Sequence, residues 1–233
     1  MRKNSIYILV LSLLIANSAS SQTAEEVIQQ VRNKLEKVND YEAKGKMKTN
    51  VTFIKIPIAK VTVYFKRPDK LRIKNEKGMS FVPKGTVNLN LSSLFTTGSN
   101  FDIIDVGKES GSNLRIIKML PREENSDIVL STLYIDEQKM VIKKAKTTTR
   151  ENGTYELELN YGKYAEYGLA DKVIFSFNTK DYKLPKGVTF DYDDGSGDKT
   201  PEDKLKNKKG KVEITYSSYS INKGVPDSVF NSP

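Results

Sequence analysis

The sequence contains no cysteine and no histidine. Without cysteine the chain can form no disulfide, and it has no thiolate for catalysis or for attaching a lipid. Without histidine it lacks the residue of Ser-His-Asp triads, of most zinc sites and of neutral-pH proton relays. Carboxylates, lysine, tyrosine and serine remain, so catalysis is disfavoured but not excluded. We therefore expect a protein that is not an enzyme and that uses no cofactor or metal.

Long apolar runs are also scarce, and the only pronounced one lies at the N-terminus. It covers residues 6–16, about half of the roughly 20 residues that a membrane-spanning helix needs. Arg2 and Lys3 precede it, and the small residues Ala19 and Ser21 stand before Gln22. This pattern predicts a signal peptide over residues 1–21, although an uncleaved anchor is an alternative. We expect residues 22–233 to form one domain that is soluble in the periplasm of a Gram-negative cell and carries no lipid anchor.

The charge is unbalanced, with 38 lysines and arginines against 29 aspartates and glutamates. A basic surface suits nucleic acid, anionic lipid or simple solvation. Nucleic acid is a poor partner for an exported protein, and we expect none. Anionic lipid head groups fit the compartment better, but lysines scattered over a solvated sheet are the more common arrangement.

One helix is predicted directly after the signal peptide. Thr23 and Glu26 form a capping-box pattern. Apolar residues then recur at helical spacing at Val27, Ile28, Val31, Leu35 and Val38. Asn39-Asp40 is expected to end the helix.

Most of the remaining sequence favours β-strands. Runs of β-branched and aromatic residues alternate with turn signals such as Pro68-Asp69. Short turns between successive strands indicate an antiparallel meander. The expected strands cover residues 41–53, 60–66, 70–75, 101–106, 114–120, 128–135, 140–149, 154–161, 172–178 and 212–221. Residues 89–95 fit either a short helix or an apolar loop.

A polar segment over residues 191–209 interrupts this pattern. Acidic residues and glycines are followed by a run of lysines, so the segment has little to bury and is expected to be mobile. Its acidic part suggests an EF-hand loop starting at Asp191. That interpretation fails because Ser196 occupies the position that requires glycine.

The order of these features resembles a known family. The helix leads into Tyr41-Glu42-Ala43, and a strand ends in residues 64–72, which read YFKRPDKLR. Residues 133–136 (LYID) and 161–164 (YGKY) follow in the same order. In this order of elements the chain resembles the periplasmic lipoprotein carriers of the LolA-like family, and more loosely LolB and the RseB lipid-sensing regulators. The segment 78–85 (GMSFVPKG) departs from the family pattern.

The resemblance implies an α+β, mostly β fold: a curved antiparallel half-barrel of about eleven strands, with an N-terminal helix and short helices over its concave face. It also implies that Arg67, at a strand end before proline, ties the sheet to this helical lid. A guanidinium offers five donors in a rigid fork, which suits carbonyls at a helix end. Without the family, a solvent-facing Arg67 is the simpler interpretation.

The same resemblance implies an apolar cavity for acyl chains of lipids or lipoproteins, and transfer partners at the inner and outer membranes. The chain would then sort outer-membrane lipoproteins as a transport chaperone, and we expect it to be a monomer. A sheet interior is nevertheless more often filled by its own side chains. The candidate lining residues are Val27, Ile28, Val31, Leu35, Phe53, Val63, Phe65, Leu71, Ile73 and Phe81.

Three alternatives stay open. A sensor of RseB type would use the same fold to bind a partner protein, but the RseB-like proteins carry a second domain. A glycan-binding module would use the tyrosines, which also suit ordinary strands. A glycan hydrolase would need two carboxylates facing a cleft, roughly 5 to 10 Å apart.

Overall fold

A computed structural model describes residues 22–51, 54–75, 101–151, 153–178 and 209–230. These residues form one α-helix, ten strands and two short 3-10 turns. The helix is α2 (Ala24–Leu35), and the turns are η1 (Ala165–Tyr167) and η2 (Asp227–Val229). The strands are β1 (Asp40–Val51), β2 (Ile54–Lys66), β3 (Lys70–Asn75), β4 (Phe101–Lys108), β5 (Arg115–Pro121), β6 (Ile128–Asp136), β7 (Val141–Thr149), β8 (Gly153–Asn160), β9 (Lys172–Asn178) and β10 (Lys209–Ile221).

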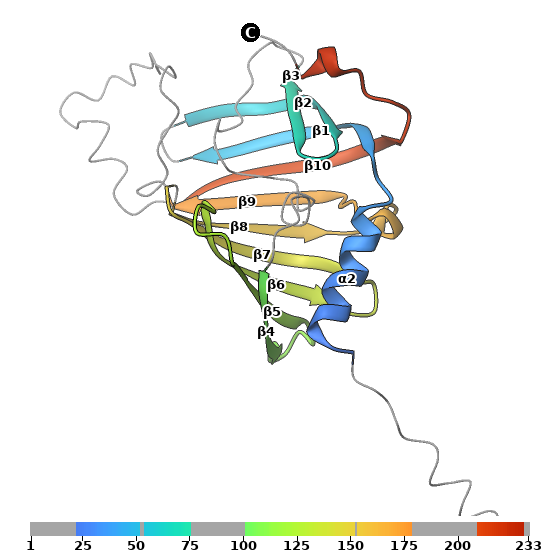
Figure 1. Ribbon diagram of the computed structural model, residues 1–233. Helices are drawn as coiled ribbons and strands as arrows, with labels where there is room; N and C mark the ends of the chain where they lie inside the picture. The colour runs from blue at the N-terminus through green and yellow to red at the C-terminus, as the bar shows by residue number, and fades with distance from the viewer. Residues whose placement is uncertain (1–21, 52–53, 76–100, 152, 179–208, 231–233) are drawn as a thin grey trace, which may run out of the picture.

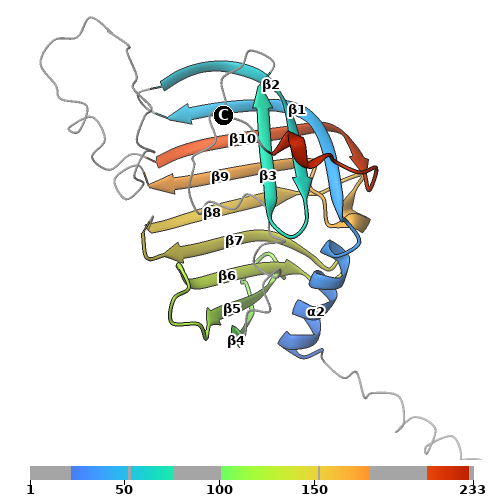
Figure 2. The same ribbon diagram turned by 45° about the horizontal axis from the view of Figure 1, so that its top comes forward.

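All ten strands belong to one antiparallel sheet with the order β3-β2-β1-β10-β9-β8-β7-β6-β5-β4. Only β10 departs from a plain meander, because it inserts between β1 and β9. Figure 1 shows the resulting curved sheet, with β3 and β4 as its two edges in the described part of the chain. Figure 2 shows that β2 bends along its length, so that β3 runs steeply across the direction of the middle strands. The sheet is therefore an open, curved half-barrel, as expected.

Helix α2 begins as the sequence predicts. The Thr23 hydroxyl accepts a hydrogen bond from the Glu26 amide (3.1 Å), and the Glu26 carboxylate accepts one from the Thr23 amide (3.0 Å). This capping box satisfies two of the amides that a helix start leaves without partners. Only three residues, Lys37 to Asn39, separate the C-cap Glu36 from β1. The helix is therefore held close to the sheet by the chain itself at its C-terminal end.

The core lies on the concave face of the sheet. Side chains alternate between the two faces of a strand, and the inward positions of the strands are apolar and buried. Examples are Ala43 and Met47 on β1, Leu133 on β6 and Phe175 on β9. Figure 1 shows α2 crossing this face near one end of the strands, where Val27, Ile28 and Val31 join the same cluster.

The expected strands are confirmed at all ten places, with ends displaced by a few residues. The first one ends at Val51 and the second starts at Ile54, six residues earlier than predicted. The half-barrel was expected to have about eleven strands, and the described residues form ten. The predicted signal peptide 1–21, the ambiguous segment 89–95 and nearly all of the predicted insert 191–209 lie outside the described residues. Lys209 itself begins β10.

Candidate functional site

The candidate site is the concave face together with the helix that crosses it. Among the residues predicted to line an apolar cavity, six are almost fully buried in one cluster: Val27, Ile28, Val31, Val63, Phe65 and Ile73. Leu35 and Leu71 are partly buried and pack against that cluster. Phe53 and Phe81 lie outside the described residues. These side chains pack against one another as part of a filled core, so their role as the lining of an acyl-chain cavity stays a prediction.

Arg67 contacts the C-terminal end of the helix, as the resemblance implies. Its Nη1 donates a hydrogen bond to the carbonyl oxygen of Glu36 (3.0 Å), and Nη2 lies 3.6 Å from the Glu36 carboxylate. Glu36 is the C-cap of α2, so its carbonyl is one of those that no residue of the helix satisfies. The Arg67 amide also donates to the carbonyl of Asn39 (2.8 Å). The end of β2 is therefore joined to both the helix and the connector that follows it.

Two further contacts attach the same end. The Asn222 side chain donates to the Lys37 carbonyl (2.8 Å) and accepts from the Asn39 amide (2.7 Å). The Lys34 ammonium donates to the carbonyl of Lys139 in the turn between β6 and β7. Burial and the neighbouring Lys37 lower the pKa of Lys34. Arg67 and Asn222 thus hold the C-terminal end of α2 and its connector, and Lys34 of the helix itself reaches the β6–β7 turn.

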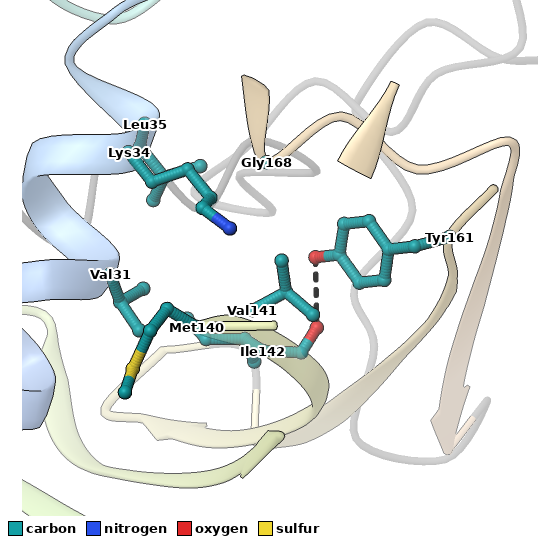
Figure 3. A pocket seen from close by; sticks show the side chains of 8 residues that line it. All are labelled: Val31, Lys34, Leu35, Met140, Val141, Ile142, Tyr161 and Gly168. Carbon is teal, nitrogen blue, oxygen red and sulfur yellow. Dashed lines mark hydrogen bonds between the residues drawn. The ribbon is translucent and has the colours of Figure 1, made fainter. Parts of the chain in front are cut away.

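A small gap remains between the helix and the sheet at this end. Figure 3 shows Val31, Lys34 and Leu35 of α2 on one side of it, and Val141 and Tyr161 on the other. The Tyr161 hydroxyl donates to the Ile142 carbonyl (2.9 Å) across its floor. No part of the gap is wide enough for a water molecule. An acyl chain would therefore have to displace α2 to enter here.

The N-terminal end of α2 is held by Arg115, which sequence reasoning missed. Nη1 of Arg115 donates to the carbonyl of Gln22 (2.7 Å) and to the Glu137 carboxylate (2.8 Å), and Nη2 donates to Asp105 (2.6 Å). The Arg115 side chain is only 9% exposed. One guanidinium therefore joins β4, β5, the β6–β7 turn and Gln22, the residue before the N-cap of the helix.

A signal for Arg115 was present in the sequence. It occupies an inward position of β5, in step with the buried Ile117 and Met119. A charge on the apolar side of an alternating strand requires partners, because burying it alone is costly. The hydrogen bonds from Arg115 lower the pKa of Asp105 and Glu137, and those to the two carboxylates raise the pKa of Arg115.

The tyrosines considered for a glycan surface mostly face inward. Tyr219 packs against Tyr41, Tyr164 and Tyr216 with ring centroids 4.9 to 5.3 Å apart, and its hydroxyl donates to the Ala170 carbonyl (2.7 Å). Burial raises the pKa of Tyr161, Tyr216 and Tyr219. These rings extend the core toward η1. They do not form a solvent-facing aromatic strip.

Basic side chains bind the carboxyl groups whose pKa values shift clearly in the described residues. The three carboxyl groups with a clear pKa shift in the described residues, Asp105, Glu137 and Asp227, all have lowered values. Each is bound to lysine or arginine, whereas a general acid needs a raised pKa near the working pH. What the site offers instead is apolar area and a helix attached at both ends.

Comparison with known proteins supports the fold. No protein-family profile matches the sequence, and no curated protein matches it either. Solved structures are similar to it, and three of them illustrate the likeness. One, from Vibrio parahaemolyticus, is a domain named for outer membrane lipoprotein sorting; it has a TM-score of 0.53 and 12% identity over 90% of this chain and 97% of that one. The second is a LolA superfamily protein from Nitrosomonas europaea, with a TM-score of 0.54 and 10% identity over 91% and 99% of the two chains.

The third is a DUF1329 family protein from Desulfovibrio piger, with a TM-score of 0.51 and 10% identity over 91% of this chain and 98% of that one. At such identities the similarity shows the fold alone. The chain therefore has a LolA-like fold, of the type found in lipoprotein carriers. None of the helices in the described residues is long and apolar enough to span a membrane.

Proposed function

We propose that this protein is a periplasmic carrier that binds the acyl chains of a lipid or a lipidated protein on its concave face. The observation that supports this most is a single apolar surface running over all ten strands and closed at one end by α2. Near its edges the apolar side chains are only partly buried, among them Leu71 on β3 and Phe101 and Ile103 on β4. The proposal includes export through the signal peptide and transfer between membrane-bound partners.

In this proposal α2 is the lid, and it opens from its N-terminal end. The C-terminal end is held by Arg67, Asn222 and Lys34 and by a three-residue link to β1. At the N-terminal end, Arg115 provides the one polar side-chain contact to the sheet among the described residues. Rotation about the short link uncovers Val27 and Ile28 first, so acyl chains would enter between these residues and β4–β6.

The energetics are compatible with such an exchange. Each acyl CH₂ group removed from water contributes about 0.8 kcal/mol. Uncovering Val27, Ile28 and Val31 costs roughly 1.5 to 3 kcal/mol for each side chain that becomes exposed. A chain of a dozen or so methylenes that takes the place of these residues against the sheet therefore offsets the loss. Contacts between the sheet and the acyl chain thus replace those between the sheet and α2, and burial of the ligand offsets the free energy lost when the helix moves.

The test is native mass spectrometry of the mature protein, purified from the periplasm of a Gram-negative host, followed by extraction and identification of any lipid. We expect an acyl-bearing adduct close to one per chain. Leu71→Glu places a charge on the concave side of β3 and should remove the adduct. Arg72→Glu, whose side chain lies on the opposite face of the same strand, is the matched control and should keep it.

The two variants separate ligand binding from folding. Both introduce a glutamate on β3, so a general effect of charge on this edge strand would appear in both. Loss of the adduct in Leu71→Glu alone supports the proposal. A lipid-free wild type that takes up neither added palmitate nor a lipopeptide would contradict it.

A further inference from the structure

The convex face of the sheet carries a groove that has no part in the proposed carrier site. It lies over β2, β1 and β10 and encloses about 1060 Å³ including its open mouth. Its polar lining comes from Lys44 and Lys46 on β1, Lys60 and Thr62 on β2, and Thr215 and Ser217 on β10. Their neighbours Ala43, Met47, Val61 and Ile214 point to the core, so these six side chains point the other way.

A β-bulge shapes this groove. Lys44 pairs with Ser218 and Gly45 with Tyr216, so Ser217 is left over on β10. The Ser217 hydroxyl donates a hydrogen bond to the Lys44 carbonyl (3.0 Å). Gly45 permits the close approach of β10, because a Cβ at this position would lie 2.5 Å from the Thr215 carbonyl oxygen. Bulges redirect side chains and increase local twist, and this one lies between the lysines of β1 and the hydroxyls of β10.

The groove concentrates positive charge. Lys46 stands directly opposite Lys60 in the β1–β2 register, and Lys44 stands opposite Thr62, two positions away. None of the described residues lining the groove is acidic. The carboxylate of Glu213, on the same face of β10, is engaged by Lys172 at 2.9 Å. An anion between Lys44 and Lys46 would accept charge-assisted hydrogen bonds from both ammonium groups.

We infer that this groove docks the protein onto a membrane by binding the phosphate groups of anionic phospholipids. The lysines supply charged donors on long, flexible stems, and the hydroxyls of Thr62 and Thr215 supply neutral donors beside them. A further basic residue, Lys74, lies outward opposite Thr62, whereas Lys48 stands opposite Glu213. A broad basic face around an open groove suits a lipid surface better than a single free phosphate. Docking this way leaves the concave face uncovered.

The test is flotation of the lipid-stripped mature protein with vesicles of equal parts phosphatidylglycerol and phosphatidylcholine, and with vesicles of phosphatidylcholine alone. We expect binding to the anionic vesicles only. The double variant Lys44→Gln/Lys46→Gln should weaken it about tenfold or more. The control Lys118→Gln/Lys146→Gln removes the same charge from outward positions of β5 and β7 and should weaken binding less than about threefold.

Equal losses in the two double variants would show that net charge alone drives adsorption, and would overturn the inference. So would a wild type that does not bind anionic vesicles. A third arm adds inorganic phosphate or chloride at equal ionic strength and follows the lysine resonances by NMR. Phosphate binding at Lys44 and Lys46 without vesicle binding would identify free phosphate as the ligand and contradict the membrane assignment. The assay uses protein without cargo, so its result does not depend on the acyl-binding test.

Discussion

The two ends of α2 are attached to the sheet in different ways. At the C-terminal end, a short link and three separate side chains share the task, and Arg67 is 31% exposed. At the N-terminal end, the polar attachment in the described residues rests on Arg115, which is 9% exposed and bound to two carboxylates. The Arg67 contact is thus one of several at its end, whereas the other end rests on Arg115; in the proposed carrier, Arg115 would therefore hold the lid closed.

The largest effect is expected from Arg115→Met. It removes four hydrogen bonds and leaves the carboxylates of Asp105 and Glu137 without the guanidinium that binds them. The free energy of unfolding should fall by about 2 to 4 kcal/mol, somewhat below the range for fully buried pairs because both carboxylates are partly exposed. Chemical denaturation measures this. Arg115→Lys keeps the positive charge but not the planar set of guanidinium donors, and should recover part of the lost stability. Equal stability of the wild type and both variants would contradict this role of Arg115.

A smaller effect is expected at Gly168, which lies beside the C-terminal end of the helix. It has a φ of +66° and a Cβ there would lie 2.9 Å from a methyl carbon of Leu35. Gly168→Ala should therefore cost about 1 to 2 kcal/mol in unfolding free energy. Amide exchange should quicken near Leu35 and change little near Thr23. Faster exchange along the whole helix would show that the two ends do not move independently.

Arg67→Ala should have a milder effect than either. The carbonyl of Glu36 lies near solvent, so water can replace the guanidinium, and the expected loss is about 1 kcal/mol. Acyl-chain uptake should rise less than in Arg115→Met, as measured by palmitate titration. A larger rise in Arg67→Ala than in Arg115→Met would reverse the comparison and make the C-terminal end the gate.

The smallest expected effect is a loss of folding stability at acidic pH. Because their pKa values are lowered in the folded protein, Asp105 and Glu137 stabilise it fully above the unfolded values near 4, and this contribution is lost as pH falls through the folded values. Asp227 behaves alike, since Lys70 and Lys66 lower its pKa to about 2. The melting temperature should fall with acid below about pH 5. High salt should suppress the contribution of the exposed Asp227 to this loss of stability in acid. It should leave most of the contribution of the two carboxylates that Arg115 binds.

Sequence patterns predicted the strands well because their inward and outward residues alternate between turn signals. They also predicted the start of α2, since the capping box is local in sequence. The Arg67 contact followed from resemblance and not from spacing, because its acceptor lies 31 residues away. The Arg115 network was missed because it joins Gln22, Asp105 and Glu137, which no local pattern connects. Residues of a cavity wall and of a filled core share one composition, so the sequence alone did not distinguish them.

The most direct test of the account measures how α2 moves when a ligand binds. The absence of cysteine allows two spin labels to be placed without background, at Lys146→Cys on the convex side of β7 and at either Glu25→Cys or Lys37→Cys, all exposed positions. Pulsed electron paramagnetic resonance then gives the distance with and without palmitate. We predict that palmitate lengthens or broadens the distance to residue 25 and leaves that to residue 37 nearly unchanged. Palmitate bound with both distances unchanged would contradict the claim that α2 is a lid opening from its N-terminal end.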